Sequence, residues 1–65
     1  MPLYFFHIVN DARIPDHLGT EFATREAAHA HATDILRRIG EMKLQSPTPF
    51  MIQVTDKDDA WLFTV

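Results

Sequence analysis

The chain has 65 residues, no cysteine, nine acidic against six basic residues, and a net charge of −3 with neutral histidines. A chain of this length forms one small domain, residues 1–65, and buries only about 60% of the surface that its unfolded form exposes. The lack of cysteine excludes disulfides, thiol catalysis and cysteine-based zinc sites, and the acidic balance argues against a nucleic-acid-binding protein.

Residues 3–10, LYFFHIVN, predict a β-strand, because aromatic and β-branched residues dominate and turn formers follow. Alternation gives this strand two faces, and both are largely apolar, which predicts a strand that is central or covered on both sides. The faces are Tyr4, Phe6 and Ile8 on one side, and Leu3, Phe5, His7 and Val9 on the other.

The following segment predicts a turn and short, interrupted extended stretches. Asn10 and Asp11 signal the turn, and residues 13–14 predict a short strand that Pro15 restricts to a sheet edge, because proline lacks a backbone donor. Gly19 is a candidate for a positive φ angle. We expect extended structure to resume over residues 20–22.

A helix is predicted from Thr24, a good N-cap, onward. Glu26 in the first turn and the pair Arg37 and Arg38 near the end suit the helix dipole. One apolar stripe repeats at intervals of four and three, with small residues first and bulky ones later, so the first half can approach a sheet closely. The stripe is Ala28, Ala32, Ile35, Ile39 and Met42.

The sequence allows two ends for this helix. Gly40 is a candidate C-cap, whereas the register of Met42 allows the helix to run on to about Lys43. Residues 45–49, QSPTP, cannot continue the helix and predict a stiff loop.

The last segments, residues 50–55 and 60–65, alternate in polarity and are joined by the polar turn DKDD, so they predict a hairpin. Alternation in the second strand places Trp61, Phe63 and Val65 on one face, opposite Leu62 and Thr64. The order β-β-α-β-β predicts an α+β fold in which one helix packs on one face of a small antiparallel sheet.

The histidines of AAHAHAT, residues 27–33, do not predict a metal site. On a helix His29 and His31 point about 200° apart, whereas a helical chelate needs i and i+4 spacing. We interpret them as border residues, with His31 beside the buried stripe and His29 more exposed. A shared metal site that uses His7 or His17 remains an alternative.

The acidic residues likewise define no site. DKDDA, residues 56–60, lacks the glycine and distal glutamate of an EF-hand, so a solvated turn is favoured. Nothing in the spacing of Asp16, Glu21 and Glu26 places a reacting atom between them.

The basic residues of the helix permit two interpretations. Arg25, Arg37, Arg38 and Lys43 form either a solvated outer face or a nucleic-acid contact through Arg25, Arg37 and Arg38. We find no phosphate loop, nucleophile motif or glycine-rich fingerprint.

An apolar excess remains on the sheet face away from the helix. Such a face is unusual for a monomer and predicts a symmetric homodimer through that face or a strand edge. The alternative is a domain whose own loop covers the face. The interface candidates are Leu3, Phe5, His7, Val9, Met51, Gln53 and Leu62.

The segments YFFHIVND, PDHLGTEFATREAAHAHA and QVTDKDDAWLFTV resemble a group of small uncharacterised proteins of rhizobia and related alphaproteobacteria. The resemblance covers nearly the whole chain and implies the strand, turn, helix and hairpin order, but no activity. One departure lies in the last turn, where the group usually carries Asp-x-x-Gly and this chain has Asp59-Ala60. The matching positions are Tyr4, Phe5, Phe6, His7, Asp16, Gly19, Glu21, Ala27, Val54, Thr55 and Asp56.

A weaker likeness is to the N-terminal half of HicB-type antitoxins, whose helix also starts with a T-x-E-A pattern, here residues 24–27. That resemblance implies a module that neutralises a partner protein through its sheet and helix.

Together these features predict a non-enzymatic interaction module that self-associates and can bind another protein. It would have no cofactor, catalytic residue or metal ligand. The alternatives are a nucleic-acid-associated or antitoxin-like regulator, and a small-molecule or metal-binding protein. No apolar run approaches the roughly 18 residues of a membrane span, and the start MPLYFF lacks the features of a signal peptide, so we expect a cytoplasmic protein.

Overall fold

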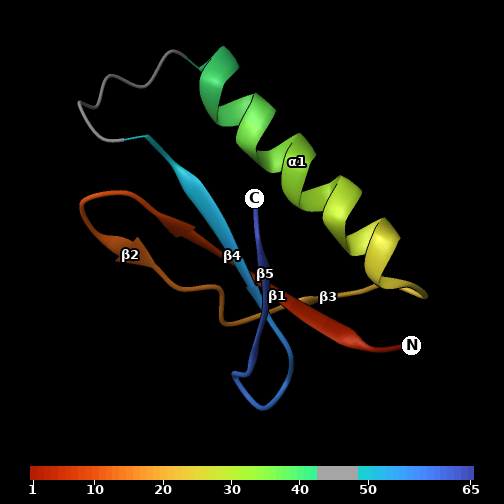
Figure 1. The fold of residues 1–65 in the computed structure, drawn as a ribbon. Helices are drawn as coiled ribbons and strands as arrows, with labels where there is room; N and C mark the ends of the chain where they lie inside the picture. Colours follow the sequence, from red (N-terminus) through yellow and green to blue (C-terminus); the bar gives the residue numbers. More distant parts are fainter. Residues whose placement is uncertain (43–48) are drawn as a thin grey trace.

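The computed structural model describes residues 1–42 and 49–65 and has five strands and one helix along the chain (Figure 1). The α+β prediction is confirmed, with one more short strand than expected, because residues 20–21 pair with the first strand. The elements are β1 (Leu3–Val9), β2 (Arg13–Ile14), β3 (Thr20–Glu21), α1 (Arg25–Glu41), β4 (Met51–Thr55) and β5 (Trp61–Thr64).

The sheet is antiparallel, with β1 and β4 in its centre. The strand order is β2-β1-β4-β5, and β3 joins the same edge of β1 as β2 does. β2 pairs with the end of β1 and β3 with its beginning, so the middle of this edge has no strand beside it. The central position of β1 agrees with the apolar character of both its faces.

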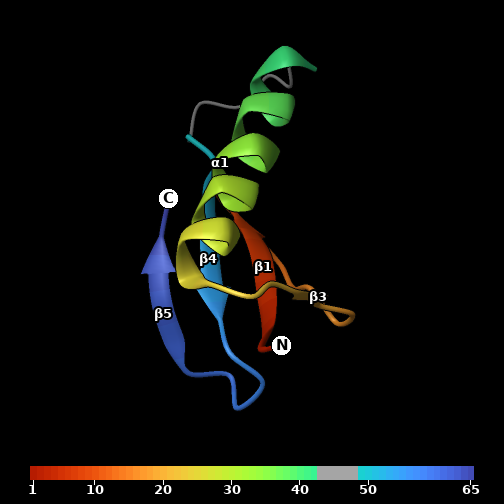
Figure 2. The same cartoon turned by 90° about the vertical axis from the view of Figure 1, so that its right-hand side faces the viewer.

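Helix α1 covers one face of the sheet. Figure 2 shows it in front of β4, with β5 to one side and β1 to the other. Ala28 and Ala32 are fully buried, and their small side chains allow the helix to lie close to the sheet. Among the described residues, the buried core consists of Tyr4, Phe6, Ala28, Ala32, Ile52 and Val54.

The start of the helix agrees with the sequence, whereas its end differs. Thr24 is the N-cap, and its hydroxyl accepts a hydrogen bond from the Ala27 N–H at 3.1 Å. The helix continues through Gly40 and ends at Glu41, with Met42 as C-cap, so of the two ends that the sequence allowed it passes the first, Gly40, and stops just short of the second, about Lys43. Met42 is 68% exposed and leaves the buried stripe, and Lys43 and residues 45–48 lie outside the described residues.

An irregularity between Val54 and Thr55 changes the faces of β5. Trp61 pairs with Thr55, but Phe63 pairs with Val54, so one extra residue, Leu62, is inserted between them. Trp61 therefore shares the face of Thr55, away from the helix, and Phe63 faces the helix. The prediction that Trp61 and Phe63 share a face is wrong, and Leu62 packs against the core instead of belonging to the opposite face.

The two glycines allow a matched test of the backbone. Gly19 has φ +74°, and a Cβ at this position would lie 3.0 Å from side-chain atoms of Leu3 and Phe5. We expect Gly19→Ala to lower the free energy of unfolding by about 1–3 kcal/mol, through the left-handed backbone and the close approach. At Gly40 a Cβ would meet no atom within 4 Å, so Gly40→Ala should raise the free energy of unfolding by up to about 1 kcal/mol. Urea unfolding of both variants checks the pair, and equal effects would contradict it.

Candidate functional site

The sheet face away from the helix, here called the outer face, is organised around His7. Its imidazole is only 4% exposed. Nδ1 accepts a hydrogen bond from the Asp16 N–H at 3.0 Å, and Nε2 lies 2.8 Å from the Thr55 hydroxyl oxygen. Because Nδ1 accepts, the neutral ring carries its hydrogen on Nε2 and donates it to Thr55. His7 thereby connects β1, β4 and the loop before β3.

Asp16 holds that loop against β1. Its carboxylate accepts hydrogen bonds from the backbone N–H groups of Phe6 at 3.1 Å, Leu18 at 3.0 Å and Gly19 at 3.2 Å. The Phe6 N–H lies in the part of β1 that neither β2 nor β3 pairs with, so the side chain replaces a missing strand partner. The positive φ of Gly19 then directs the chain into β3.

Both side chains have displaced pKa values. Burial, followed by the positive charge of Arg13, lowers the pKa of His7, although Asp59 and Asp16 act in the opposite direction. Burial alone would raise the pKa of Asp16, but the three backbone N–H groups together lower it below its usual range. At neutral pH the pair is therefore a neutral imidazole beside an ionised carboxylate.

The loop covers the outer face only in part. Leu3, Phe5 and Val9 are half-buried, as is Gln53, while Met51 is 42% exposed. Of the interface candidates, His7 lies on the predicted face but is buried there by its own chain, whereas Leu62 packs against the core and not on that face.

Trp61 is the outer-face residue that the sequence analysis missed. It is 65% exposed, and its indole N–H donates to the Thr64 hydroxyl at 2.8 Å, so the ring is held along β5 with its polar group already satisfied. Strict alternation placed Trp61 beneath the helix. A bulge has no clear signature in this strand, so the sequence offered no signal to correct that placement.

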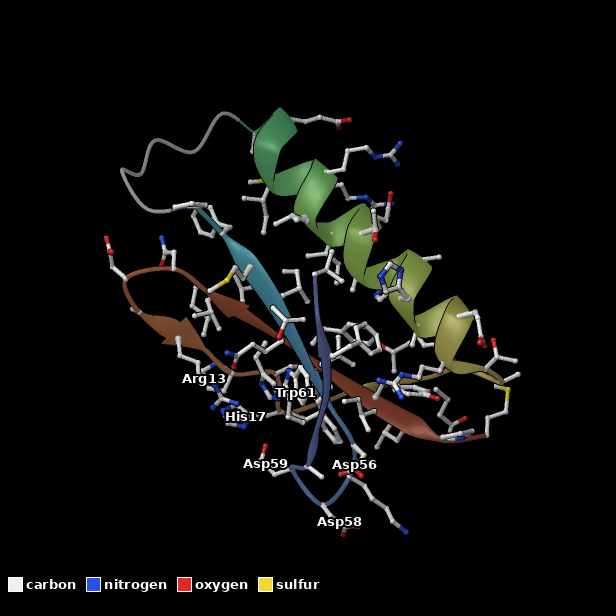
Figure 3. All side chains as sticks on the ribbon, in the orientation of Figure 1. Arg13, His17, Asp56, Asp58, Asp59 and Trp61 are labelled. Carbon is white, nitrogen blue, oxygen red and sulfur yellow. The ribbon has the colours of Figure 1, made fainter. Side chains whose placement is uncertain are left out.

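A pocket of about 330 Å³ opens on the same face, between the loop before β3 and the turn that joins β4 to β5. Figure 3 shows Arg13 and His17 on one side and Asp59 toward the turn. The pocket is lined by Phe5, His7, Arg13, Pro15, Asp16, His17, Thr55, Asp56, Lys57 and Asp59.

The acidic turn is structured by one of its own side chains. Asp56 Oδ1 accepts from the backbone N–H groups of Asp58 at 2.9 Å and Ala60 at 3.0 Å. Asp59 has φ 63°, a conformation that glycine adopts more readily. Glu21 and Glu26 do not line the pocket with Asp16, so the three acids do not form one site.

The two helix histidines lie on opposite flanks, as predicted. The His31 ring packs on Phe6 with centroids 4.8 Å apart, and the His29 ring lies 5.3 Å from that of Phe63 on β5. His7 has no free ring nitrogen for a metal, which argues against the site with His17. In residues 1–42 and 49–65, no three His, Asp or Glu side chains gather where they could hold a metal ion.

The helix arginines do not form one basic strip. Arg37 and Arg38 both pair with Asp34. Arg25 donates to the Leu62 carbonyl oxygen, with its guanidinium 5.3 Å from the centre of the Phe63 ring. It also lies about 18 Å along the helix from Arg37, given 1.5 Å per residue. This arrangement gives little support to the nucleic-acid alternative.

The family model for Domain of unknown function (DUF6894) matches residues 3–65, and the chain belongs to this family. No curated protein and no solved structure matches the chain. Within the part of the chain that the structure describes, no helix has the length and apolar character that a membrane crossing requires.

The His7 geometry predicts a pH dependence of stability. An unfolded histidine takes up a proton near pH 6.5, whereas folded His7 does so only at lower pH. The contribution of His7 to the free energy of unfolding is therefore complete above about pH 6.5, and it is lost as the pH falls through the lower pKa of the folded state. Urea unfolding between about pH 8 and pH 5 should show this loss for the wild type and less of it for His7→Gln.

His29→Gln, which removes an exposed histidine of the helix, away from His7, is the matched control and should keep the wild-type dependence of the free energy of unfolding on pH. If His7→Gln left the dependence of the free energy of unfolding on pH unchanged, His7 would not be its source.

Proposed function

We propose that this chain is a non-enzymatic cytoplasmic interaction module that self-associates through its outer face. The observation that carries the proposal is the exposed indole of Trp61, fixed by its hydrogen bond to Thr64. Tryptophan is enriched among the residues that contribute most to binding energy at interfaces. Burying a ring whose N–H is already bonded leaves no polar group unsatisfied.

The register of the sheet places further residues on the outer face together with Trp61. Val9, Met51 and Arg13 lie in one row at the far end of the same face, since Val9 pairs with both Met51 and Arg13. Met51 adds exposed apolar surface. Exposed apolar side chains therefore lie toward both ends of the outer face, Trp61 at one end and Met51 at the other.

A second copy is the partner that the charges of this face favour. Arg13 lies on one side of the pocket and the acidic turn, residues 56–59, on the other, so this face carries groups of both signs. A two-fold axis through the face would place the basic side of each copy over the acidic turn of the other, as a self-complementary interface requires. The face is a better candidate than the β5 edge, because Arg25 already occupies the Leu62 carbonyl there.

The His7 geometry supports a role without catalysis. Both ring nitrogens take part in internal hydrogen bonds, which supports a structural role for this buried histidine over that of a proton acceptor for a substrate.

Sedimentation equilibrium over a concentration series tests the proposal. We expect a dimer whose Kd rises roughly 30-fold or more in Trp61→Ala, the effect of losing about 2 kcal/mol at an interface centre. Met42→Ala removes an equally exposed apolar side chain from the end of the helix and should leave the Kd unchanged. A wild-type chain that stays monomeric at tens of micromolar would rule out self-association.

A further inference from the structure

We infer that the outer-face pocket is a binding site for a small organic carboxylate. The pocket of about 330 Å³ lies within the size range of small-molecule sites, at its lower end. This inference does not depend on the proposed self-association, since the pocket is formed by a single chain.

The first argument is that two basic side chains of the pocket can still donate hydrogen bonds to a ligand. Asp16 and Asp56 are engaged by backbone N–H groups, so their carboxylates already have donors. Arg13, His17 and Lys57 also line the pocket, and in the described part of the chain no ion pair within 4 Å joins them to an acid. Asp16 and Asp56 stay charged, but their oxygens already have donors, so Arg13 and Lys57 are the charged groups of the pocket with hydrogen-bonding capacity left for an anionic ligand.

The second argument is a buried donor. Thr55 is only 5% exposed and lines the pocket. Because His7 donates to its oxygen, the hydroxyl hydrogen of Thr55 is left to donate elsewhere, and no acceptor for it is found in residues 1–42 and 49–65. A buried donor of this kind, beneath basic side chains, suits an anionic oxygen.

The walls of the pocket select the kind of anion. Phe5 and Pro15 provide apolar surface for an organic body beside the charged group. The guanidinium of Arg13 can bind a carboxylate through two parallel hydrogen bonds. Asp59 also faces the pocket, and its negative charge disfavours a multiply charged anion such as phosphate. The favoured ligand is therefore a singly charged carboxylate with an apolar body.

Benzoate is a suitable probe, with benzamide as its uncharged counterpart and inorganic phosphate as the competing anion. Trp61 is the single tryptophan of the chain and pairs with Thr55, so its fluorescence can report binding. The titration is made at a protein concentration at which sedimentation shows a monomer, so that ligand binding is separated from self-association.

We expect benzoate to bind with a Kd in the millimolar range or tighter, and benzamide at least about tenfold more weakly. Arg13→Gln should weaken benzoate binding at least about tenfold, because it removes a charge-assisted contact. Arg38→Gln, on the exposed end of the helix, should leave it unchanged. Asp59→Asn should strengthen it by up to about fivefold.

Three results would overturn the inference: no fluorescence change with benzoate, equal binding of benzamide, or an Arg13→Gln variant that binds benzoate as well as the wild type. Phosphate binding tighter than benzoate binding would overturn the assignment to an organic carboxylate. Circular dichroism of each variant verifies that the fold is retained.

Discussion

The hydrogen bonds of His7 to Asp16 and Thr55 are the interaction on which the outer half of this domain depends. A β-sheet this small needs cover on both faces, and α1, the one helix among residues 1–42 and 49–65, covers only one of them. The second cover is the loop before β3, which lies on the sheet because His7 accepts from its backbone and its Asp16 carboxylate accepts from β1. Buried polar groups are tolerated here because each has a partner, and among the described residues no buried side-chain nitrogen or oxygen lacks one.

This arrangement leaves the two faces of the sheet with different roles. The helix face is a closed apolar core in which the alanines of α1 allow close packing. The outer face is only half covered, so it retains both the exposed Trp61 and a pocket floored by His7 and Thr55. A binding function follows more readily from the outer face, because it combines exposed apolar surface with charged groups that have not been paired internally.

Several residues of the outer face and the last turn have a structural role. His7, Asp16 and Gly19 hold the loop before β3 in place, and Asp56 shapes the last turn through its backbone contacts. These residues define the scaffold. The side chains that we expect to contact partners, Trp61 and Arg13, lie on that scaffold without supporting it.

The sequence by itself determined the central strand, the capped helix with its alanine-rich stripe, the terminal hairpin and the opposite flanks of His29 and His31, because these follow from local periodicity and capping chemistry. Only the tertiary structure decided the rest. The extra residue in β5 reversed the face of Trp61, because a bulge depends on pairing with β4 and alternation within one strand cannot reveal it. The burial of His7 and the pocket beside it depend on Asp16, nine residues away, meeting an N–H that no strand pairs, a long-range contact that local patterns do not encode.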